Sequence, residues 1–390
     1  MIANMMILHT LKIVLHHWRW VIRLGILIFL LSQIAPPRLR VMLENPPQTV
    51  ITNKPKVCVH TDLIHEPPES SIQMSLQLIR EMGAPTIVEF FPWAYIERSP
   101  DVYDWNQPDL ILKHAQNQGI KIIARMGLVP DWARPKDTSF NYIDADGIGD
   151  FAEFVADFAK RYAGQIDHII IWNEPNLAFE WGFAPNATAP SRYVQMLQAV
   201  YHPLHEANPN ITVLAGALAP TLEPVGSPNG LDDLLYLQGM YDAGAKGYFD
   251  ALAIHAYGFT TPPEESPAPR ALNFRRAELL RDIMVANGDE QKPAYITESG
   301  WNDNPRWIQA VRPSQRTIYT LSAFQIAETW DWAETLCLWI FRHPTPRNTH
   351  RDNFTLVTPF FQIKPIYYAI QSYARGFGEE GQLWLNPPEG

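Results

Sequence analysis

The sequence predicts an α/β protein, a (β/α)8 TIM barrel that forms a single domain. Two observations predict this fold. Short runs rich in β-branched residues alternate strictly with amphipathic segments of helical period, and eight such units fill residues 56–375 of the 390. Strict alternation implies a parallel sheet, because each parallel strand needs a crossover helix. Eight units favour closure into a barrel.

The expected strands are Lys56–His60, Thr86–Phe90, Lys121–Met126, His168–Trp172, Thr212–Ala217, Ala251–Ala256, Ala294–Thr297 and Leu336–Phe341. The expected helices are 70–83, 109–118, 150–162, 191–207, 231–243, 271–287, 313–328 and 365–374. The helix over 150–162 has the clearest pattern, with phenylalanines recurring at helical spacing. An open doubly wound sheet would show the same alternation. However, His60-Thr61-Asp62 replaces the Gly-rich phosphate turn expected after its first strand.

The N-terminal 35 residues differ from the rest. No acidic residue precedes Glu44, and several basic residues flank the short apolar run Leu24–Ala35. This pattern is typical of an export signal or a signal-anchor, with a buried helix as the alternative. We therefore expect an extracytoplasmic protein, either secreted or tethered to the membrane. The expected segments are a signal peptide or signal-anchor over 1–35, a linker over 36–55, the barrel over 56–375 and a tail over 376–390.

The chain has only two cysteines, Cys58 and Cys337, which excludes a disulfide framework and a cysteine zinc site. The predicted fold places them on the first and last strands, which are neighbours in a closed barrel. A disulfide is conceivable there. We expect two buried free thiols instead, because free cysteine is commonly buried.

The formal net charge of -10 disfavours a nucleic-acid partner, since phosphate binding needs a clustered cationic surface. The chain also holds 13 Trp and 15 Tyr. Their flat faces suit the apolar faces of sugar rings and equally suit a large core. Composition leaves those two interpretations open.

Ionisable groups follow the strands at the carboxyl-terminal face, where a barrel of this kind places its active site. Strand four leads into Asn173-Glu174-Pro175, strand seven into Glu298-Ser299-Gly300, and strand six ends in His255-Ala256-Tyr257. Two carboxylates that meet across a barrel mouth suit hydrolysis of a glycosidic bond. One protonates the leaving oxygen while the other attacks the anomeric carbon or activates water.

The stretches Trp172-Asn173-Glu174-Pro175-Asn176 and Thr297-Glu298-Ser299-Gly300-Trp301 resemble those of the retaining (β/α)8-barrel glycoside hydrolases. The resemblance is closest to glycoside hydrolase family 39 and to cellulase-like family 5, and it covers residues 56–375. It implies a catalytic domain that hydrolyses β-linked O-glycosidic bonds through a covalent glycosyl-enzyme intermediate. It also implies an oligosaccharide or polysaccharide substrate, no cofactor and no metal.

The same resemblance implies roles for five residues. Glu174 corresponds to the general acid/base and Glu298 to the nucleophile. Asn173 corresponds to the residue that binds the sugar 2-hydroxyl. Tyr257 corresponds to a tyrosine that donates a hydrogen bond to the nucleophile, and His255 to its partner on the same face of the strand.

Three tryptophans complete the predicted site. The resemblance makes Trp339, near the end of strand eight, the aromatic floor of the sugar subsite. Trp93 and Trp181 fall in predicted rim loops and are candidate sugar-stacking residues. Packing within the loop is the alternative for both of them.

The sequence departs from the family pattern on strand two, which lacks the basic residue that often supports the nucleophile. Arg125 or Arg342 could supply that charge, and we expect Glu89 to be a buried partner of Arg125. A cluster that includes His343 and His350 lacks the spacing of a metal site, so a solvated loop is expected there.

Other functions remain open at this point. The altered second strand favours a carbohydrate-binding barrel that has lost catalysis. The N-terminal segment is compatible with a component of a surface-polysaccharide assembly. A transglycosidase would share every catalytic residue with a hydrolase. The fold alone decides among none of these.

Overall fold

The structure, a computed structural model, describes residues 18, 20–27, 47–66, 68–183 and 188–376. It divides into two units, Met1–Met42 and Leu43–Gly390. Residues 18 and 20–27 are helical. In the described part of the chain, no helix is both long enough and apolar enough to cross a membrane. Most of the expected N-terminal segment, most of the linker and nearly all of the tail lie outside the described residues.

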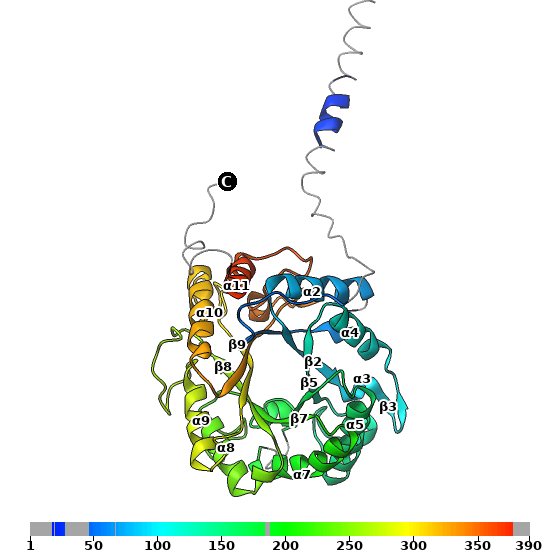
Figure 1. The fold of residues 1–390 in the computed structure, drawn as a ribbon, viewed down its shortest axis with the longest axis vertical. Coiled ribbons are helices and arrows are strands. Elements are labelled where there is room, and N and C mark those ends of the chain that lie inside the picture. The colour runs from blue at the N-terminus through cyan, green and yellow to red at the C-terminus, as the bar shows by residue number, and fades with distance from the viewer. Residues whose placement is uncertain (1–17, 19, 28–46, 67, 184–187, 377–390) are drawn as a thin grey trace, which may run out of the picture. The chain divides into compact units, whose positions relative to one another are not determined.

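Eight parallel strands form a closed barrel, which confirms the predicted fold class (Figure 1). Around the barrel they are β1 (Val57–His60), β2 (Thr86–Pro92), β5 (Lys121–Gly127), β6 (His168–Ile171), β7 (Thr212–Leu218), β8 (Ala251–Tyr257), β9 (Ala294–Gly300) and β10 (Ala333–Leu338). Strand β10 pairs back onto β1 and closes the ring. Each predicted strand is present, and β10 begins and ends three residues earlier than expected.

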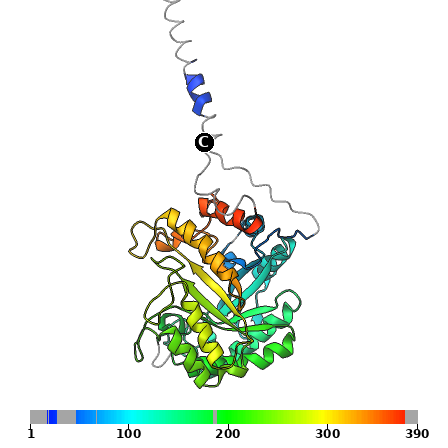
Figure 2. The ribbon, with the colours of Figure 1, turned by 60° about the vertical axis from the view of Figure 1, so that its left-hand side comes forward.

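Eight longer helices surround the barrel (Figures 1 and 2). They are α2 (Glu69–Met82), α4 (Asn106–Asn117), α5 (Ala145–Arg161), α7 (Pro190–Ala207), α8 (Asp233–Asp242), α9 (Arg276–Ala286), α10 (Pro313–Glu328) and α11 (Pro365–Arg375). Shorter helices are η1 (Leu63–His65), α3 (Trp93–Ile96), η2 (Asp131–Ala133), α6 (Ala178–Trp181), η3 (Ala245–Gly247) and η4 (His350–Asn353). A hairpin of β3 (Glu97–Ser99) and β4 (Val102–Tyr103), which the sequence did not predict, lies between α3 and α4.

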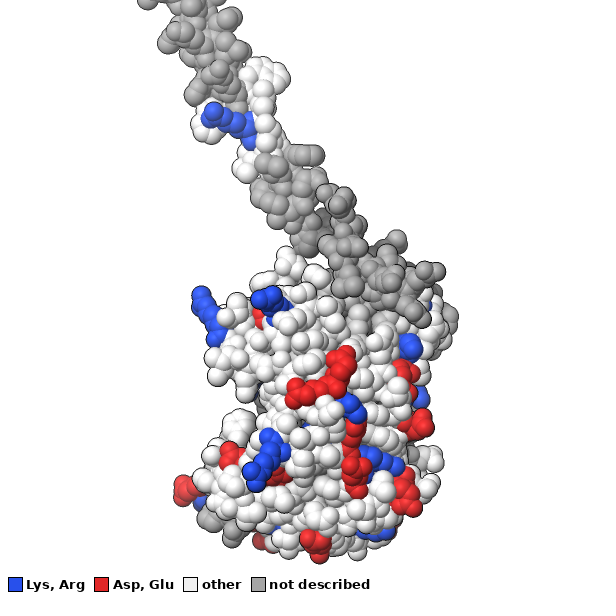
Figure 3. Space-filling model, turned by 90° about the vertical axis from the view of Figure 1, so that its left-hand side faces the viewer, with Lys and Arg blue, Asp and Glu red and all other residues white. Residues whose placement is uncertain are grey.

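Charged side chains of both signs are intermixed on the face of the molecule shown in Figure 3. Exposed ion pairs of this kind contribute little to stability. A buried set joins α8 and α9 instead. Arg276 of α9 lies 2.8 Å from Asp233 and 3.0 Å from Asp232 at the start of α8. The buried guanidinium of Arg276 is therefore paired with carboxylates, as a buried charge requires.

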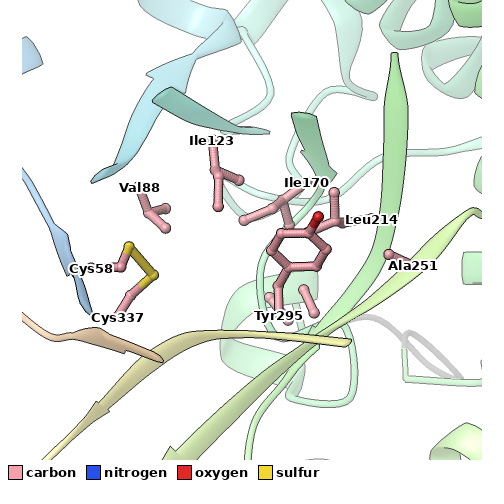
Figure 4. Packing of buried hydrophobic residues seen from close by; sticks show 10 residues of the cluster. Cys58, Val88, Ile123, Ile170, Leu214, Ala251, Tyr295 and Cys337 are labelled. Carbon is pink, nitrogen blue, oxygen red and sulfur yellow. A yellow bond between two sulfur atoms is a disulfide. The ribbon is translucent and has the colours of Figure 1, made fainter. Parts of the chain in front are cut away.

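A cluster of inward-facing apolar side chains fills the barrel interior (Figure 4). Its members are Cys58, Val88, Ile123, Ile170, Leu214, Ala217, Ala251, Ala253, Tyr295 and Cys337. Side chains alternate between the two faces of a strand, so residues two positions further along point the same way. This alternation sets which side chains line the carboxyl-terminal mouth.

Cys58 and Cys337 form a disulfide between the first and last barrel strands (Figure 4). The expectation of two free thiols was therefore wrong. Both residues are buried, as expected, but they are also direct partners in the β1–β10 register. The sequence placed them on neighbouring strands without showing that they lie at the same level.

We predict that replacing both cysteines, in Cys58→Ala/Cys337→Ala, lowers the free energy of unfolding by about 2–4 kcal/mol, because the bond closes a long loop in the unfolded chain. Urea unfolding monitored by tryptophan fluorescence measures the loss. Wild-type protein treated with a reductant serves as the control and should show a similar loss. Two reactive thiols in unfolded wild-type protein without reductant would contradict the assignment.

Candidate active site

The mouth of the barrel is lined by side chains one layer above the apolar core. On β8, Ala251 and Ala253 belong to the core, and His255 and Tyr257 continue the same inward face. His60 stands two residues beyond Cys58 on β1. The strict alternation of each strand therefore delivers these polar side chains to one place.

Glu298 reaches this layer through a β-bulge in β9. Ile254 pairs with Ile296, whereas the next residue, His255, pairs with Glu298, so Thr297 is an extra residue. Tyr295 faces the core, and regular alternation would turn Thr297 inward and Glu298 outward. The extra residue reverses that order and directs the Glu298 carboxylate into the mouth.

Glu174 is placed by an irregular backbone after β6. Trp172 and Glu174 have φ values of 74° and 42°, a region that costs about 1 kcal/mol or more for a residue with a side chain. The Glu174 amide donates to the carbonyl of Ala217, 3.0 Å away. This turn packs the Trp172 ring outward against Phe151 and Trp181, while the Glu174 carboxylate faces the mouth.

The two carboxylates meet on either side of His255. His255 Nδ1 lies 2.8 Å from Glu174 Oε1 and 3.6 Å from Glu298 Oε2. One ring nitrogen of His255 and one carboxylate oxygen from each glutamate lie within 4.8 Å of one another. Three such atoms could also hold a metal ion, so the lack of a metal requirement stays a prediction.

Glu298 is buried and surrounded by donors and positive charge. Tyr257 Oη donates to Glu298 Oε2 over 2.7 Å, and His60 Nε2 lies 3.6 Å from Oε1. Burial raises the pKa of Glu298, but the charge of His255, with that of Arg125 and the Tyr257 hydrogen bond, brings it below its usual value. Glu298 therefore stays ionised, as a nucleophile requires.

The two histidines respond to burial in opposite ways. Burial lowers the pKa of His60 to about 4. For His255, burial is outweighed by the charge of Glu298 and by its hydrogen bond with Glu174, so its pKa is raised. His255 is therefore more readily protonated than an ordinary histidine, whereas His60 is neutral near pH 7. His60 Nδ1 lies 2.9 Å from the Thr61 carbonyl, which leaves Nε2 as an acceptor.

Trp93 and Trp181 do not line the site, so their prediction as sugar-stacking residues is corrected. Both side chains are fully buried. Trp93 stacks on Phe154 of α5 and donates to Glu97 over 2.6 Å. Trp181 packs against the outward-facing Trp172. Each occupies the space between the barrel and a helix, where no sugar has access.

Trp339 and Asn173 lie beside the pair of carboxylates. Trp339 follows β10 directly, its amide donates to the Ser299 carbonyl over 2.9 Å, and its side chain is partly exposed. Asn173 precedes Glu174 and donates to Glu180, and its own Oδ1 is buried without a partner among the described residues. Their contacts with substrate stay predictions.

The sequence missed two residues of the site. His60 could have been found by continuing the inward face of β1 from Cys58. Glu180 gave no such signal, because it reaches Asn173 from the short helix α6. Burial and the charge of Glu174 raise the pKa of Glu180 to about 7.

The missing charge of strand two is supplied by Arg125, which lowers the pKa of Glu298. Its guanidinium lies 4.4 Å from the centre of the Phe90 ring. Glu89 was wrongly predicted to be its partner, because Glu89 and Phe90 point to opposite faces of β2. Glu89 instead accepts hydrogen bonds from Thr61 and from two backbone amides. Arg342 pairs with Glu66 over 2.8 Å.

Residues 345–349 and 351 are exposed, as expected for a solvated loop, whereas His343 differs from that expectation and His350 is half-buried. His343 is buried, with its ring 5.7 Å from that of Trp339. His350 stacks on Trp307, with ring centres 4.6 Å apart. Ring packing therefore accounts for much of the environment of both histidines.

No protein-family model and no curated protein matches the sequence. Among solved structures, the chain is similar to a family 39 glycoside hydrolase from the gut symbiont Bacteroides cellulosilyticus WH2. The TM-score is 0.66 at 21% identity, over 82% of this chain and 63% of that chain.

Two further structures show the same likeness. A GH5_18 protein from Streptomyces cattleya in complex with GlcNAc has a TM-score of 0.64 at 13% identity, over 83% of this chain and 80% of that one. The exo-beta-1,4-mannosidase Op5Man5 from Opitutaceae bacterium strain TAV5 has 0.54 at 16%, over 90% and 64%. The chain spans less than two thirds of the family 39 protein and of the mannosidase. At identities this low, the likeness establishes the shared barrel fold alone.

If Glu298 is the nucleophile that the sequence predicts, Tyr257→Phe should lower kcat/KM on a glycoside that the wild type cleaves about 10- to 100-fold, the usual effect of losing a hydrogen bond to a charged group. The variant also removes a contact that lowers the pKa of Glu298. The acidic limb of the pH profile of kcat/KM should therefore move to higher pH. An unchanged acidic limb would contradict this role of Tyr257.

Proposed function

We propose that the protein is a retaining glycoside hydrolase. The observation that carries this proposal is the closeness of Glu174 and Glu298, because one carboxylate oxygen of each lies within 4.8 Å of the other. Retaining glycosidases hold their carboxyl groups about 5–5.5 Å apart, whereas inverting enzymes keep them about 6.5–9.5 Å apart to admit a water molecule. The spacing here suits direct attack by one carboxylate.

Glu298 is proposed as the nucleophile, because its surroundings keep it ionised. Glu174 is proposed as the acid that protonates the leaving oxygen. Once the sugar is esterified to Glu298, the negative charge of that carboxylate disappears. Glu174 then acts as the base that activates water, and hydrolysis of the ester restores both groups.

Three buried polar atoms support the binding of a hydroxylated substrate. Asn173 Oδ1, His60 Nε2 and His255 Nε2 have no hydrogen-bond partner among the described residues. Buried polar atoms are rarely left unpaired, and sugar hydroxyls would pair with them. Trp339, exposed in part beside them, offers an aromatic face to the same sugar.

A β-linked substrate is proposed on the basis of the similar structures. Several of them hold GlcNAc or Manβ1-4GlcNAc, and one is an exo-β-1,4-mannosidase. β-Mannosides and β-N-acetylglucosaminides are therefore the first substrates to test.

An extracytoplasmic location is also proposed. It is supported by the basic flank and apolar run of the N-terminus and by the Cys58–Cys337 bond. Structural disulfides persist mainly outside the reducing cytosol. Whether the N-terminal segment is cleaved or anchors the chain is left open by this proposal.

The proposed function is tested with the full chain on a panel of aryl β-glycosides. Glu174→Gln and Glu298→Gln should each lower kcat by about 1,000-fold or more, because each removes a reacting group. Glu153→Gln, on the exposed face of α5, is the matched control and should retain activity. Added azide should rescue Glu298→Gly and give a glycosyl azide of inverted configuration.

Two results would contradict this proposal. A product of inverted configuration from the wild-type protein would exclude the retaining mechanism. Glycan binding that survives both glutamine substitutions, without turnover by the wild type, would indicate a carbohydrate-binding barrel instead.

A further inference from the structure

A hollow of about 610 Å³ opens between the loops that follow β1 and β2. His65 of η1, Tyr95 of α3, Arg98 of β3 and Asp104, just before α4, are among its lining residues. The elements α3, β3 and α4 lie together at the right of Figure 1. None of these four side chains takes part in the chemistry proposed for Glu174 and Glu298.

The walls of this hollow are fixed. Gln107, near the start of α4, donates to the carbonyls of Leu63 and Glu66 over 3.2 and 3.1 Å. Its side chain therefore ties α4 to the loop that contains η1. A concave site with fixed walls binds without a large ordering cost.

The lining of the hollow matches the surface of a sugar. Tyr95 is 45% exposed, and the His65 ring meets it edge-on with centres 5.7 Å apart. Arg98 Nη2 and Asp104 Oδ2 lie 3.3 Å apart, and both side chains are open to solvent. The aromatic face suits the apolar C–H face of a sugar, and the adjacent donor and acceptor suit its hydroxyls.

A run of contacts joins the hollow to the catalytic mouth. The Trp339 ring lies 5.7 Å from that of His343, and His343 Nδ1 lies 3.7 Å from Asp62 Oδ2. Asp62 Oδ1 in turn lies 2.5 Å from Nδ1 of His65, which borders the hollow beside Tyr95. These contacts link Trp339 to Tyr95 through the buried His343, so the hollow and the mouth share one packed wall of the barrel rim.

The order of the strands around the barrel shows whether the hollow lies on the leaving-group side of the cleaved bond or on the opposite side. Glu174 follows β6, the fourth barrel strand, and Trp339 follows β10, the eighth, which lies opposite. The acid must stand beside the leaving group, so the leaving part of the substrate departs on the β6 side. The sugar that Glu298 retains, and any units attached to it, lie towards β10, β1 and the hollow.

We propose that the hollow is a subsite for a sugar unit of a β-linked glycan chain, on the non-reducing side of the cleaved bond and beyond the sugar that reacts. The inference rests on the proposed function and deepens it. It makes the substrate a chain with at least one further sugar on the non-reducing side of the sugar that reacts.

The test compares tetrasaccharides with single-sugar substrates. Mannotetraose, cellotetraose and xylotetraose are assayed alongside the p-nitrophenyl β-glycosides of the same sugars. Tyr95→Ala should lower the ratio of kcat/KM on the preferred tetrasaccharide to kcat/KM on its monoside about tenfold, which is the loss expected for one aromatic contact. Tyr368→Ala on α11, similarly exposed at 40%, is the control and should leave the ratio unchanged.

A wild-type enzyme that cleaves the monosides, with a ratio that Tyr95→Ala does not change, would overturn the subsite and leave the proposed function intact. If the wild type cleaves no substrate, the proposed function fails and calorimetry with the same tetrasaccharides decides the subsite. Weaker binding by Tyr95→Ala than by Tyr368→Ala would then support it. Equal binding by the two variants, or no binding to the wild type, would overturn it.

Discussion

The candidate site depends on one extra residue in one strand. Thr297 forms a bulge in β9, and without it the Glu298 carboxylate would face the surrounding helices rather than the mouth. The contacts of Glu298 depend on that orientation, including the hydrogen bond from Tyr257 and the approach to His255. A single change of backbone register therefore decides whether the two carboxylates can meet.

Bringing two carboxylates together in a buried site has an electrostatic cost, and the barrel offsets it from several strands. His255 stands between them, and Arg125 adds charge from β5. The environment is asymmetric, because Glu298 is the carboxylate that His60 and Tyr257 also contact. Two groups of the same type can take different roles when their surroundings differ in this way.

Much of this arrangement could be predicted from the sequence. Eight strand-helix units determined the fold, and the strand ends identified both glutamates, because barrel topology brings all strand ends to one rim. The predictions that failed concerned the direction in which individual side chains point from their helix, strand or loop. Trp93 was predicted to contact sugar from a rim loop, but its side chain packs between the barrel and α5. Glu89 lies on the opposite face of the sheet from Arg125. Such directions depend on register and on where each loop begins, which residue types alone do not reveal.

The Cys58–Cys337 bond changes the topology of the molecule as well as its stability. With the first and last strands joined, the barrel becomes a covalent ring whose two cysteines are separated by 279 positions in the sequence. A single peptide-bond cut in any loop within that ring would leave one covalently connected molecule, because the disulfide still joins the two fragments. Backbone cleavage by a protease therefore need not release any part of the barrel.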